Sequence, residues 1–427
     1  MKVLSGAILT SCAHLSRIIM GLILLKVIAL YLGAEGMGQL GQFMSLSTMV
    51  YMVAGGGVSN AVIKYVAEYS SAPKKLLRFV SAATTYSALF SGVICIVGVV
   101  FSKEIALVIF KNPDMFWVII VLAVAQVLFS FVNLVVGVSN GLMQTVIYSK
   151  VQIIGSALGI PVIWFLISHF GLMGAAFSIV VMYAITSVPA LYYYVKSSFF
   201  GRVKLLKLVA VEYKNLSSYT LMMLTSAMTF PVVEMVVRHL LIASDGYAAA
   251  GVWQGAIKLS SAYLGFFTVF LAYYFMPSIS RLDNKAEIGR VTLKFLVSVG
   301  LLFGTGASVF YVGRDILIPL ILADSFSSLS DVIVYQLVGD FFRISSYVIG
   351  FVAVAKAATK IYIASELVQN GLFLLFSMLM LRQYGDIKAV MIAYAISYVV
   401  YFLVSVVFFG VYLKATPLDR RINTSAG

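Results

Sequence analysis

Long apolar runs recur from one end of the chain to the other and are separated by short polar segments. A helix of about 20 apolar residues is long enough to cross the hydrocarbon core of a bilayer. Twelve runs meet this length, and they lack the short alternation of apolar and polar residues that is typical of barrel strands. They lie near 5–33, 39–66, 79–101, 115–139, 144–168, 174–195, 216–242, 247–276, 291–312, 330–355, 359–381 and 389–413. We therefore predict an all-α membrane protein with twelve transmembrane helices.

The composition excludes a soluble protein. Hydrophobic residues make up 62% of the chain and charged residues only 11%, and the mean hydropathy is +1.03. In a soluble protein roughly a quarter of all residues are charged, because its surface faces water. Lipid is therefore the expected surrounding of most of the chain.

The positions of Lys and Arg predict the orientation, because basic loops remain on the cytoplasmic side. With both termini in the cytoplasm, twenty of the 30 basic residues lie in cytoplasmic segments or at cytoplasmic helix ends, six on the periplasmic side, where Arg238 is counted near the end of its span, and four deeper within spans. We therefore expect a multi-pass protein of the bacterial inner membrane with both termini in the cytoplasm. The net charge of +14 is spread over helix ends, as in membrane anchoring, so we expect no nucleic-acid partner.

The longest basic connection, near 196–215, divides the chain into two sets of six spans. We expect two six-helix bundles, 1–200 and 205–427, related by a pseudo-twofold axis along the membrane normal. A weak echo supports the repeat: Gly36-Met37-Gly38-Gln39 follows Lys26, and Gly251-Val252-Trp253-Gln254 follows Arg238. Transporters built from two such bundles bind substrate between them.

Ionisable side chains within the spans are the first candidates for a site, because a charge in hydrocarbon costs about 2.5–3.5 kcal/mol on insertion scales. Five are basic and three acidic, an excess that suits an anionic passenger, since guanidinium and ammonium groups bind phosphate oxygens. The basic residues are Arg17, Lys26, Arg238, Lys258 and Arg343, and the acidic residues are Glu234, Asp340 and Glu366.

Each charge also has an alternative interpretation. Lys26 lies about 180° around the helix from Arg17 and is close enough to the membrane surface to extend its ammonium there. Lys258 could pair with an acid on another helix. Glu234 and Arg238, four residues apart, could neutralise each other. Asp340 and Arg343, three apart, form a second such pair, but their central depth makes them better candidates for a cavity.

Amides and tyrosines within the spans are suited to a sugar, because they donate and accept hydrogen bonds and the phenol rings offer flat faces. The same groups could simply join helices to one another. They are Gln39, Gln42, Asn60, Gln254, Gln336, Gln369, Tyr183, Tyr263, Tyr335 and Tyr347. The run Gly55-Gly56-Gly57 predicts a kink or a close helix contact.

The sequence contains neither a phosphate-binding loop of the Walker type nor a metal-ligand cluster, so we expect no cofactor and no metal, and a transporter rather than an enzyme. Energy would then come from an ion gradient. Asp340, Glu366, Glu234 and His14 are the groups that could carry a proton. Glu366 is the first choice, because its own span holds no basic neighbour.

Several segments in chain order resemble the Wzx flippases of the multidrug/oligosaccharidyl-lipid/polysaccharide exporter superfamily. The first is the stretch from Lys26 to Gln39, KVIALYLGAEGMGQ. The others are Lys64-Tyr65-Val66-Ala67-Glu68-Tyr69, Gly251-Val252-Trp253-Gln254-Gly255, Met276-Pro277-Ser278-Ile279-Ser280-Arg281-Leu282 and Gln336-Leu337-Val338-Gly339-Asp340.

The resemblance implies alternating access between two six-helix bundles and transfer of an undecaprenyl-diphosphate-linked glycan from the cytoplasmic to the periplasmic leaflet. The glycan would be the enterobacterial common antigen unit, to whose flippases the segments are most similar, or an O-antigen unit. Basic cavity positions of the family correspond to Lys26, Lys64 and Arg343, whereas Lys258 departs from its pattern. A polysaccharide polymerase and a chain-length regulator are the expected partners. The alternatives are a cation-coupled multidrug or metabolite antiporter of the same superfamily and a scaffold for glycan assembly.

Overall fold

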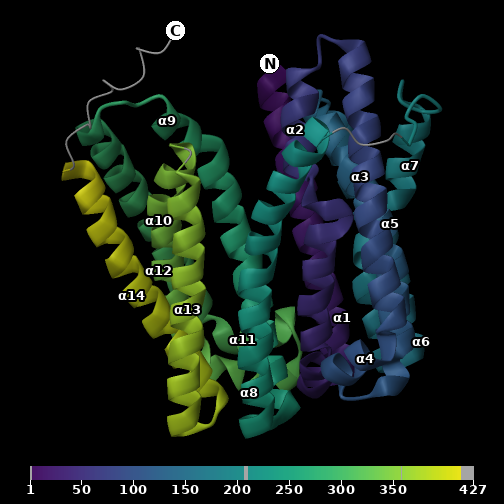
Figure 1. The fold of residues 1–427 in the computed structure, drawn as a ribbon. Coiled ribbons are helices and arrows are strands. Elements are labelled where there is room, and N and C mark those ends of the chain that lie inside the picture. The colour runs from purple at the N-terminus through teal and green to yellow at the C-terminus, as the bar shows by residue number, and fades with distance from the viewer. Residues whose placement is uncertain (1, 206–209, 357, 415–427) are drawn as a thin grey trace. The chain divides into compact units, whose positions relative to one another are not determined.

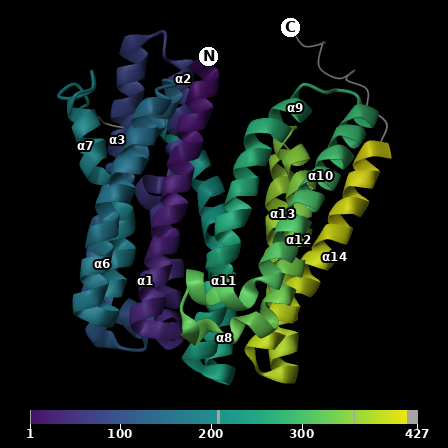
Figure 2. The same cartoon turned by 180° about the vertical axis from the view of Figure 1, so that it is seen from behind.

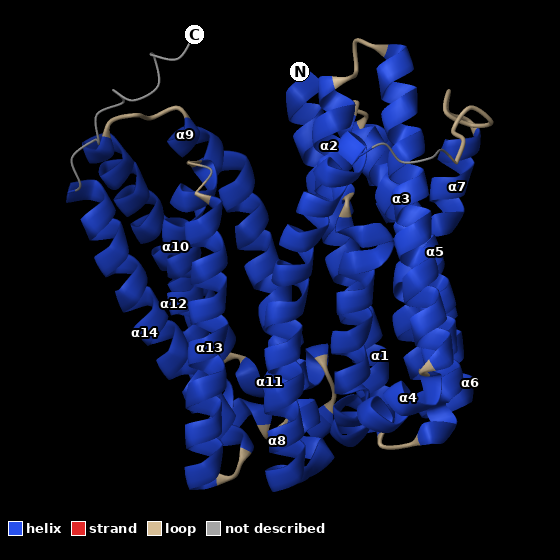
Figure 3. Ribbon diagram, in the orientation of Figure 1, coloured by secondary structure: helices blue, strands red, loops and turns tan. Residues whose placement is uncertain are grey.

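The computed structural model describes residues 2–205, 210–356 and 358–414, and the ordered elements in these ranges are helices joined by short turns (Figure 3). Contacts between residues divide the chain into two compact units. Unit 1 comprises Met1–Ala262, Asp315–Asp331 and Tyr384–Ile387, and unit 2 comprises Tyr263–Arg314, Val332–Gln383 and Lys388–Gly427. The predicted division into bundles 1–200 and 205–427 stays a prediction.

Unit 1 is built from eight helices and several shorter turns (Figure 1). The helices are α1 (Lys2–Val53), α2 (Ser59–Glu68), α3 (Pro73–Val100), α4 (Ser102–Phe110), α5 (Phe116–Gly141), α6 (Thr145–Ala184), α7 (Ser187–Val195) and α11 (Arg314–Ile321). Most of α8 (Ala210–Phe270) also belongs to this unit. The short turns are η1 (Ala54–Gly57), η2 (Pro113–Met115) and η4 (Asp324–Phe326).

Unit 2 begins with the last turns of α8, from Tyr263, and contains five further helices. They are α9 (Met276–Ser280), α10 (Lys285–Val312), α12 (Leu329–Ala355), α13 (Thr359–Tyr384) and α14 (Ile387–Lys414), with the π-helical segment η3 (Leu271–Phe275) before α9. Its apolar core includes Phe275, Phe303, Ile344 and Val348, and Figure 2 shows α10, α12 and α14 from behind.

The described residues contain nine segments long and apolar enough to span a membrane, and three of these are folded back on themselves at a glycine. Gly33, Gly171 and Gly246 have φ values of 63°, 52° and 82°, a region that glycine adopts at little cost. Each turn divides one segment into two spans, which gives the twelve predicted helices. The fold class is confirmed.

At each of these glycines, a residue before the glycine contacts a residue after it, so the chain reverses its direction there. Arg17 lies over Tyr51 across Gly33, Ser178 Oγ donates to Ile163 O at 3.4 Å across Gly171, and Arg238 donates to Gln254 across Gly246. In Figures 1 and 2, α2 accordingly lies at the same end of unit 1 as the start of α1.

The run Gly55–Gly57 breaks the helix, as predicted. Gly55 and Gly56 have φ values of 67° and 80°, and the chain forms η1 before α2 begins. A Cβ on Gly55 would lie 2.3 Å from Ser130 Oγ of α5. The run therefore provides both the kink and the close helix contact.

Candidate functional site

A buried polar network surrounds Arg238, whose side chain is fully buried on the first arm of α8. Its Nη1 donates to Ser45 Oγ at 3.1 Å and to Gln42 Oε1 at 3.4 Å, both on α1. Its Nη2 donates to Gln254 Oε1 on the second arm of α8, and the guanidinium lies 5.4 Å from the Trp253 ring centroid. Because Arg238 joins three helical segments, this network stabilises the packing of unit 1.

Glu234 joins the same network through Ser45. The Ser45 hydroxyl donates to Glu234 Oε2 at 3.2 Å and accepts from Arg238, so it links the two charges. Lys258 is half-buried and within electrostatic reach of Glu234 and Arg238. Glu234 thus interacts electrostatically with Lys258 from the other arm of the α8 hairpin. This supports the alternative that Lys258 has an acidic partner on another span.

Glycines allow the backbones around this network to approach closely. A Cβ on Gly38 would lie 1.9 Å from Tyr247 O, and a Cβ on Gly251 would lie 1.7 Å from Ala34 O. A Cβ on Gly41 would lie 2.6 Å from Arg238 Nε. The two glycine segments that echo each other in the sequence therefore pack directly against each other.

Lys26 is half-buried, and its Nζ donates to Pro319 O of α11 at 3.1 Å. A backbone carbonyl thus accepts from its ammonium group. Gln39 is half-buried on α1, whereas Asn60 and Lys64 are exposed on α2. Asn60 Nδ2 lies 3.7 Å from Met223 Sδ, and Lys64 Nζ lies 4.9 Å from the Tyr65 ring centroid.

Arg17 is exposed on the first arm of α1, and its guanidinium carbon lies 5.3 Å from the centroid of Tyr51. Tyr51 stacks on Tyr183 with centroids 4.5 Å apart. His14, one turn before Arg17, contacts Tyr148 OH at 3.3 Å. The Arg17 guanidinium therefore combines an accessible charge with an aromatic surface.

The second polar network lies in unit 2, around Asp340 and Arg343 of α12. The Asp340 carboxylate is fully buried and accepts from Tyr263 OH and, at 2.6 Å, from Tyr394 OH. Arg343 donates to Tyr394 OH at 3.0 Å and to Tyr347 OH at 2.9 Å. The Tyr394 hydroxyl therefore joins the acid to the base within one network.

The Arg343 side chain is only half-buried, unlike that of Arg238. Its guanidinium carbon lies 5.1 Å from the Tyr398 centroid and 5.7 Å from the Tyr347 centroid. A Cβ on Gly339 would lie 2.3 Å from the Tyr394 ring, so this glycine makes room for the central tyrosine. The cation is therefore held by phenols and remains partly accessible.

Glu366 and Gln369 of α13 lie next to this network. Gln369 Nε2 donates to Tyr398 OH at 3.2 Å. Glu366 is half-buried, Asn370 Nδ2 donates to its backbone carbonyl at 2.8 Å, and Arg343 lies within electrostatic reach of its carboxylate. The base that is missing from its own span is thus supplied by α12.

Several residues of the two polar networks and of the aromatic group around Arg17 give no distinctive signal in the sequence. Ser45 resembles any helix-joining serine in a sequence, and Tyr51, Tyr394 and Tyr398 lie in apolar runs rich in tyrosine. Tyr394 and Tyr398 are the exception, because they are four residues apart and therefore share one face of a helix. Within the described residues, no group of three or more His, Cys, Asp or Glu is placed to hold a metal ion.

The chain is similar to known proteins over nearly its whole length. It is 30% identical over 407 residues to the "Lipid III flippase" of Escherichia coli (strain K12) and to that of Shigella flexneri, covering 94% of this chain and 97% of each relative. Among solved structures, an inward-facing multidrug resistance MATE family transporter of the MOP superfamily matches with a TM-score of 0.71 at 14% identity, covering 96% of this chain and 99% of that one.

The lipid II flippase MurJ, in an inward closed conformation, also matches with a TM-score of 0.71, at 12% identity, covering 95% of this chain and 90% of that one. These two structural likenesses establish the fold. The family model described as "Polysaccharide biosynthesis protein" matches residues 3–283. The chain is thus a multi-pass membrane protein of the polysaccharide biosynthesis protein family, with the fold of the MOP superfamily.

Proposed function

We propose that this protein is a flippase that moves an undecaprenyl-diphosphate-linked oligosaccharide from the cytoplasmic to the periplasmic leaflet of the inner membrane. The observation that carries the proposal is the 30% identity to lipid III flippases over 94% of the chain. The glycan would be the enterobacterial common antigen unit, with an O-antigen unit as the next candidate. The protein acts as a transporter and performs no covalent chemistry.

The two accessible guanidinium groups are suited to the anionic part of this substrate. Arg17 and Arg343 each present a planar group with several N–H donors, which matches the oxygens of a diphosphate. Both are backed by phenol rings, which present flat faces to sugars. We therefore assign diphosphate recognition to Arg17 and Arg343, and we give Lys64 and Asn60, exposed on α2, a secondary role.

Lys26, Lys258 and Gln254 receive different roles from those first expected, whereas Gln39 keeps its expected role in contact with the glycan. Gln254 accepts from Arg238 and is fully buried, so it acts in packing rather than in contact with sugar. Lys26 would bind the substrate only after its hydrogen bond to Pro319 O is broken. Lys258 would bind it only after moving away from Glu234. Gln39 is partly accessible and could contact the glycan directly.

Transport would proceed by alternating access, with an ion gradient as the source of energy. Moving one charge across 100 mV supplies about 2.3 kcal/mol. Glu366 is our first candidate for the proton carrier, because it is half-buried and lies within electrostatic reach of the partly accessible Arg343. Asp340 and Glu234 are the second candidates, since both are already bound to hydroxyl donors.

The test is a flipping assay in proteoliposomes with a fluorescent polyprenyl-diphosphate glycan, with and without an imposed pH gradient. We expect the unaltered protein to flip the glycan in a gradient-dependent way. The Arg343→Gln variant should not flip it, and the Glu366→Gln variant should flip it at a rate that does not depend on the gradient. The matched control is Lys74→Gln, an exposed basic residue at the start of α3. Transport of cationic drugs with no flipping of the glycan would instead support the antiporter.

We further infer that both termini are cytoplasmic and that a polysaccharide polymerase and a chain-length regulator receive the flipped glycan. The excess of basic residues in the segments assigned to the cytoplasm supports the orientation. Fusions of a periplasm-specific enzyme to each terminus should be inactive. Co-purification from crosslinked membranes would detect the two partners.

A further inference from the structure

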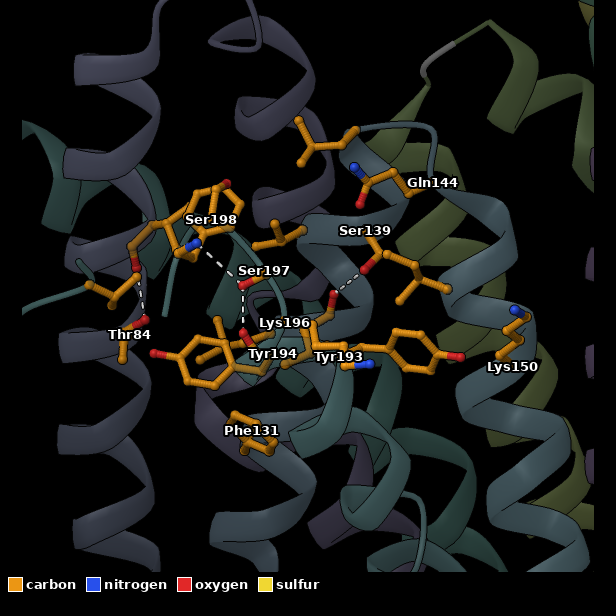
Figure 4. Close-up of a pocket in the computed structure, with 18 of the residues that line it drawn as sticks. Thr84, Phe131, Ser139, Gln144, Lys150, Tyr193, Tyr194, Lys196, Ser197 and Ser198 are labelled. Carbon is orange, nitrogen blue, oxygen red and sulfur yellow. Dashed lines mark hydrogen bonds between the residues drawn. The ribbon is translucent and has the colours of Figure 1, made fainter. Parts of the chain in front are cut away.

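A cavity of about 690 Å³ lies within unit 1 (Figure 4). Its walls come from α3, α5, α6, α7 and the turn that follows α7. None of its lining residues belongs to the Arg238 network or to the aromatic group around Arg17. The residues that matter most for its chemistry are Thr84, Phe131, Ser139, Lys150, Tyr193 and Lys196.

The cavity wall is largely apolar, although several lining residues have hydroxyl groups. Ser139 Oγ donates to Val135 O, Thr84 Oγ1 donates to Val80 O, and Ser197 Oγ donates to Tyr194 O, at 2.7–2.8 Å. Each hydroxyl hydrogen is therefore used within its own helix or turn. Valine, leucine and phenylalanine provide most of the remaining wall. Such a surface receives a hydrocarbon chain without breaking these three hydrogen bonds.

The charged residues of the lining are two lysines, and no acid accompanies them. Lys150 is exposed near the start of α6, and Lys196 is exposed directly after α7. In Figure 4 the ring of Tyr193 extends from the centre of the view, where Lys196 is labelled, toward Lys150 at the right. The Lys196 ammonium donates to Tyr192 OH and has two further N–H bonds. The cavity therefore combines an apolar interior with a positive rim.

We propose that this cavity binds an anionic phospholipid of the surrounding bilayer, with an acyl chain inside and the phosphate at Lys150 and Lys196. The volume falls in the range of about 300–1,000 Å³ in which proteins enclose small apolar ligands. That space suits one or two acyl chains and is too small for the long polyprenyl chain of the proposed substrate. The bound lipid would join α3, α5, α6 and α7 at the basic end of unit 1.

The test uses the full-length protein in detergent micelles and a tryptophan inside the cavity. Phe131→Trp supplies the reporter, and Trp117→Phe with Trp164→Phe removes the two exposed native tryptophans, leaving Trp253, which is fully buried. The probes are phosphatidylglycerol and phosphatidylcholine with brominated acyl chains, which quench tryptophan on contact. We expect saturable quenching by phosphatidylglycerol, with phosphatidylcholine binding at least about fivefold more weakly.

The lysines are tested by Lys150→Gln and Lys196→Gln, each expected to weaken phosphatidylglycerol binding by about fivefold, and together by about 25-fold. The matched control is Lys74→Gln with Lys75→Gln, which removes the same charge from exposed positions outside the cavity. Native mass spectrometry of the lysine variants, with residue 131 unchanged, repeats the measurement if the reporter variant does not fold.

Three results would overturn the proposal. One is equal quenching by the two lipids, and another is equal loss of binding in the cavity and control variants. The third is displacement of the brominated lipid by an equimolar polyprenyl diphosphate, which would assign the cavity to the proposed substrate. These measurements require no transport, so a failed flipping assay leaves their interpretation unchanged.

Discussion

The two polar networks contain the same kinds of charge but differ in what surrounds them. Around Arg238, side chains of serine and glutamine bind a fully buried guanidinium, and glycines bring the backbones together. Around Arg343, tyrosines bind a half-buried guanidinium, and Glu366 and Gln369 lie beside it. The arginine of the first network is thus a packing element, whereas the arginine of the second is an accessible cation. Burial and the type of partner distinguish the two.

The largest expected effect is on stability, at Arg238. Arg238→Met should destabilise the protein by about 3–5 kcal/mol, because it removes the three hydrogen bonds of a buried guanidinium that Ser45 links to the buried Glu234 carboxylate. Thermal unfolding in detergent measures the loss. Arg238→Met combined with Glu234→Gln should recover most of it, and equal instability of the single and double variants would argue against charge coupling.

Arg343 should show the opposite behaviour, with transport lost and stability largely kept. Arg343→Gln should reduce flipping by tenfold or more, because a hydrogen bond to a charged group contributes about 1.5–3 kcal/mol. Expression and thermal unfolding should change less than in Arg238→Met. Arg343→Lys retains the charge and tests whether the guanidinium geometry is needed. A flipping rate unchanged by Arg343→Gln would remove Arg343 from the site.

Gly41→Ala tests the close packing of the first network. The added Cβ would lie 2.6 Å from Arg238 Nε, so we expect a loss of about 1–3 kcal/mol in the free energy of unfolding. The matched control is Gly21→Ala on the same helix, where nothing lies within 4 Å of the new Cβ. The control should be neutral or slightly stabilising, because alanine favours a helix more than glycine does.

The smallest expected effect belongs to the phenol that links Asp340 and Arg343. Tyr394→Phe removes the hydroxyl that donates to Asp340 and accepts from Arg343, so flipping should fall severalfold, corresponding to about 1 kcal/mol. Tyr398→Phe, which loses only the hydrogen bond from Gln369, serves for comparison. Equal effects of the two variants would contradict a special role for Tyr394.

The fold could be predicted from the sequence more fully than the site. Apolar length reports membrane spans directly, and the gaps between predicted spans fall at or beside Gly33, Gly171 and Gly246. The pairing of Asp340 with Arg343 followed from helical spacing alone. Gln254 was expected to meet substrate but binds Arg238, because its partner lies across a hairpin that spacing along one helix does not describe. The roles of Arg17, Lys64, Asn60 and Glu366 remain predictions.

The three glycine turns have a consequence for how the chain can be probed. At Gly33, Gly171 and Gly246 one span follows the next with almost no connecting loop. Proteases, antibodies and inserted epitope tags all need several accessible residues in an extended segment. Topology mapping by these reagents should therefore miss these three turns and count nine segments where the bilayer is crossed twelve times.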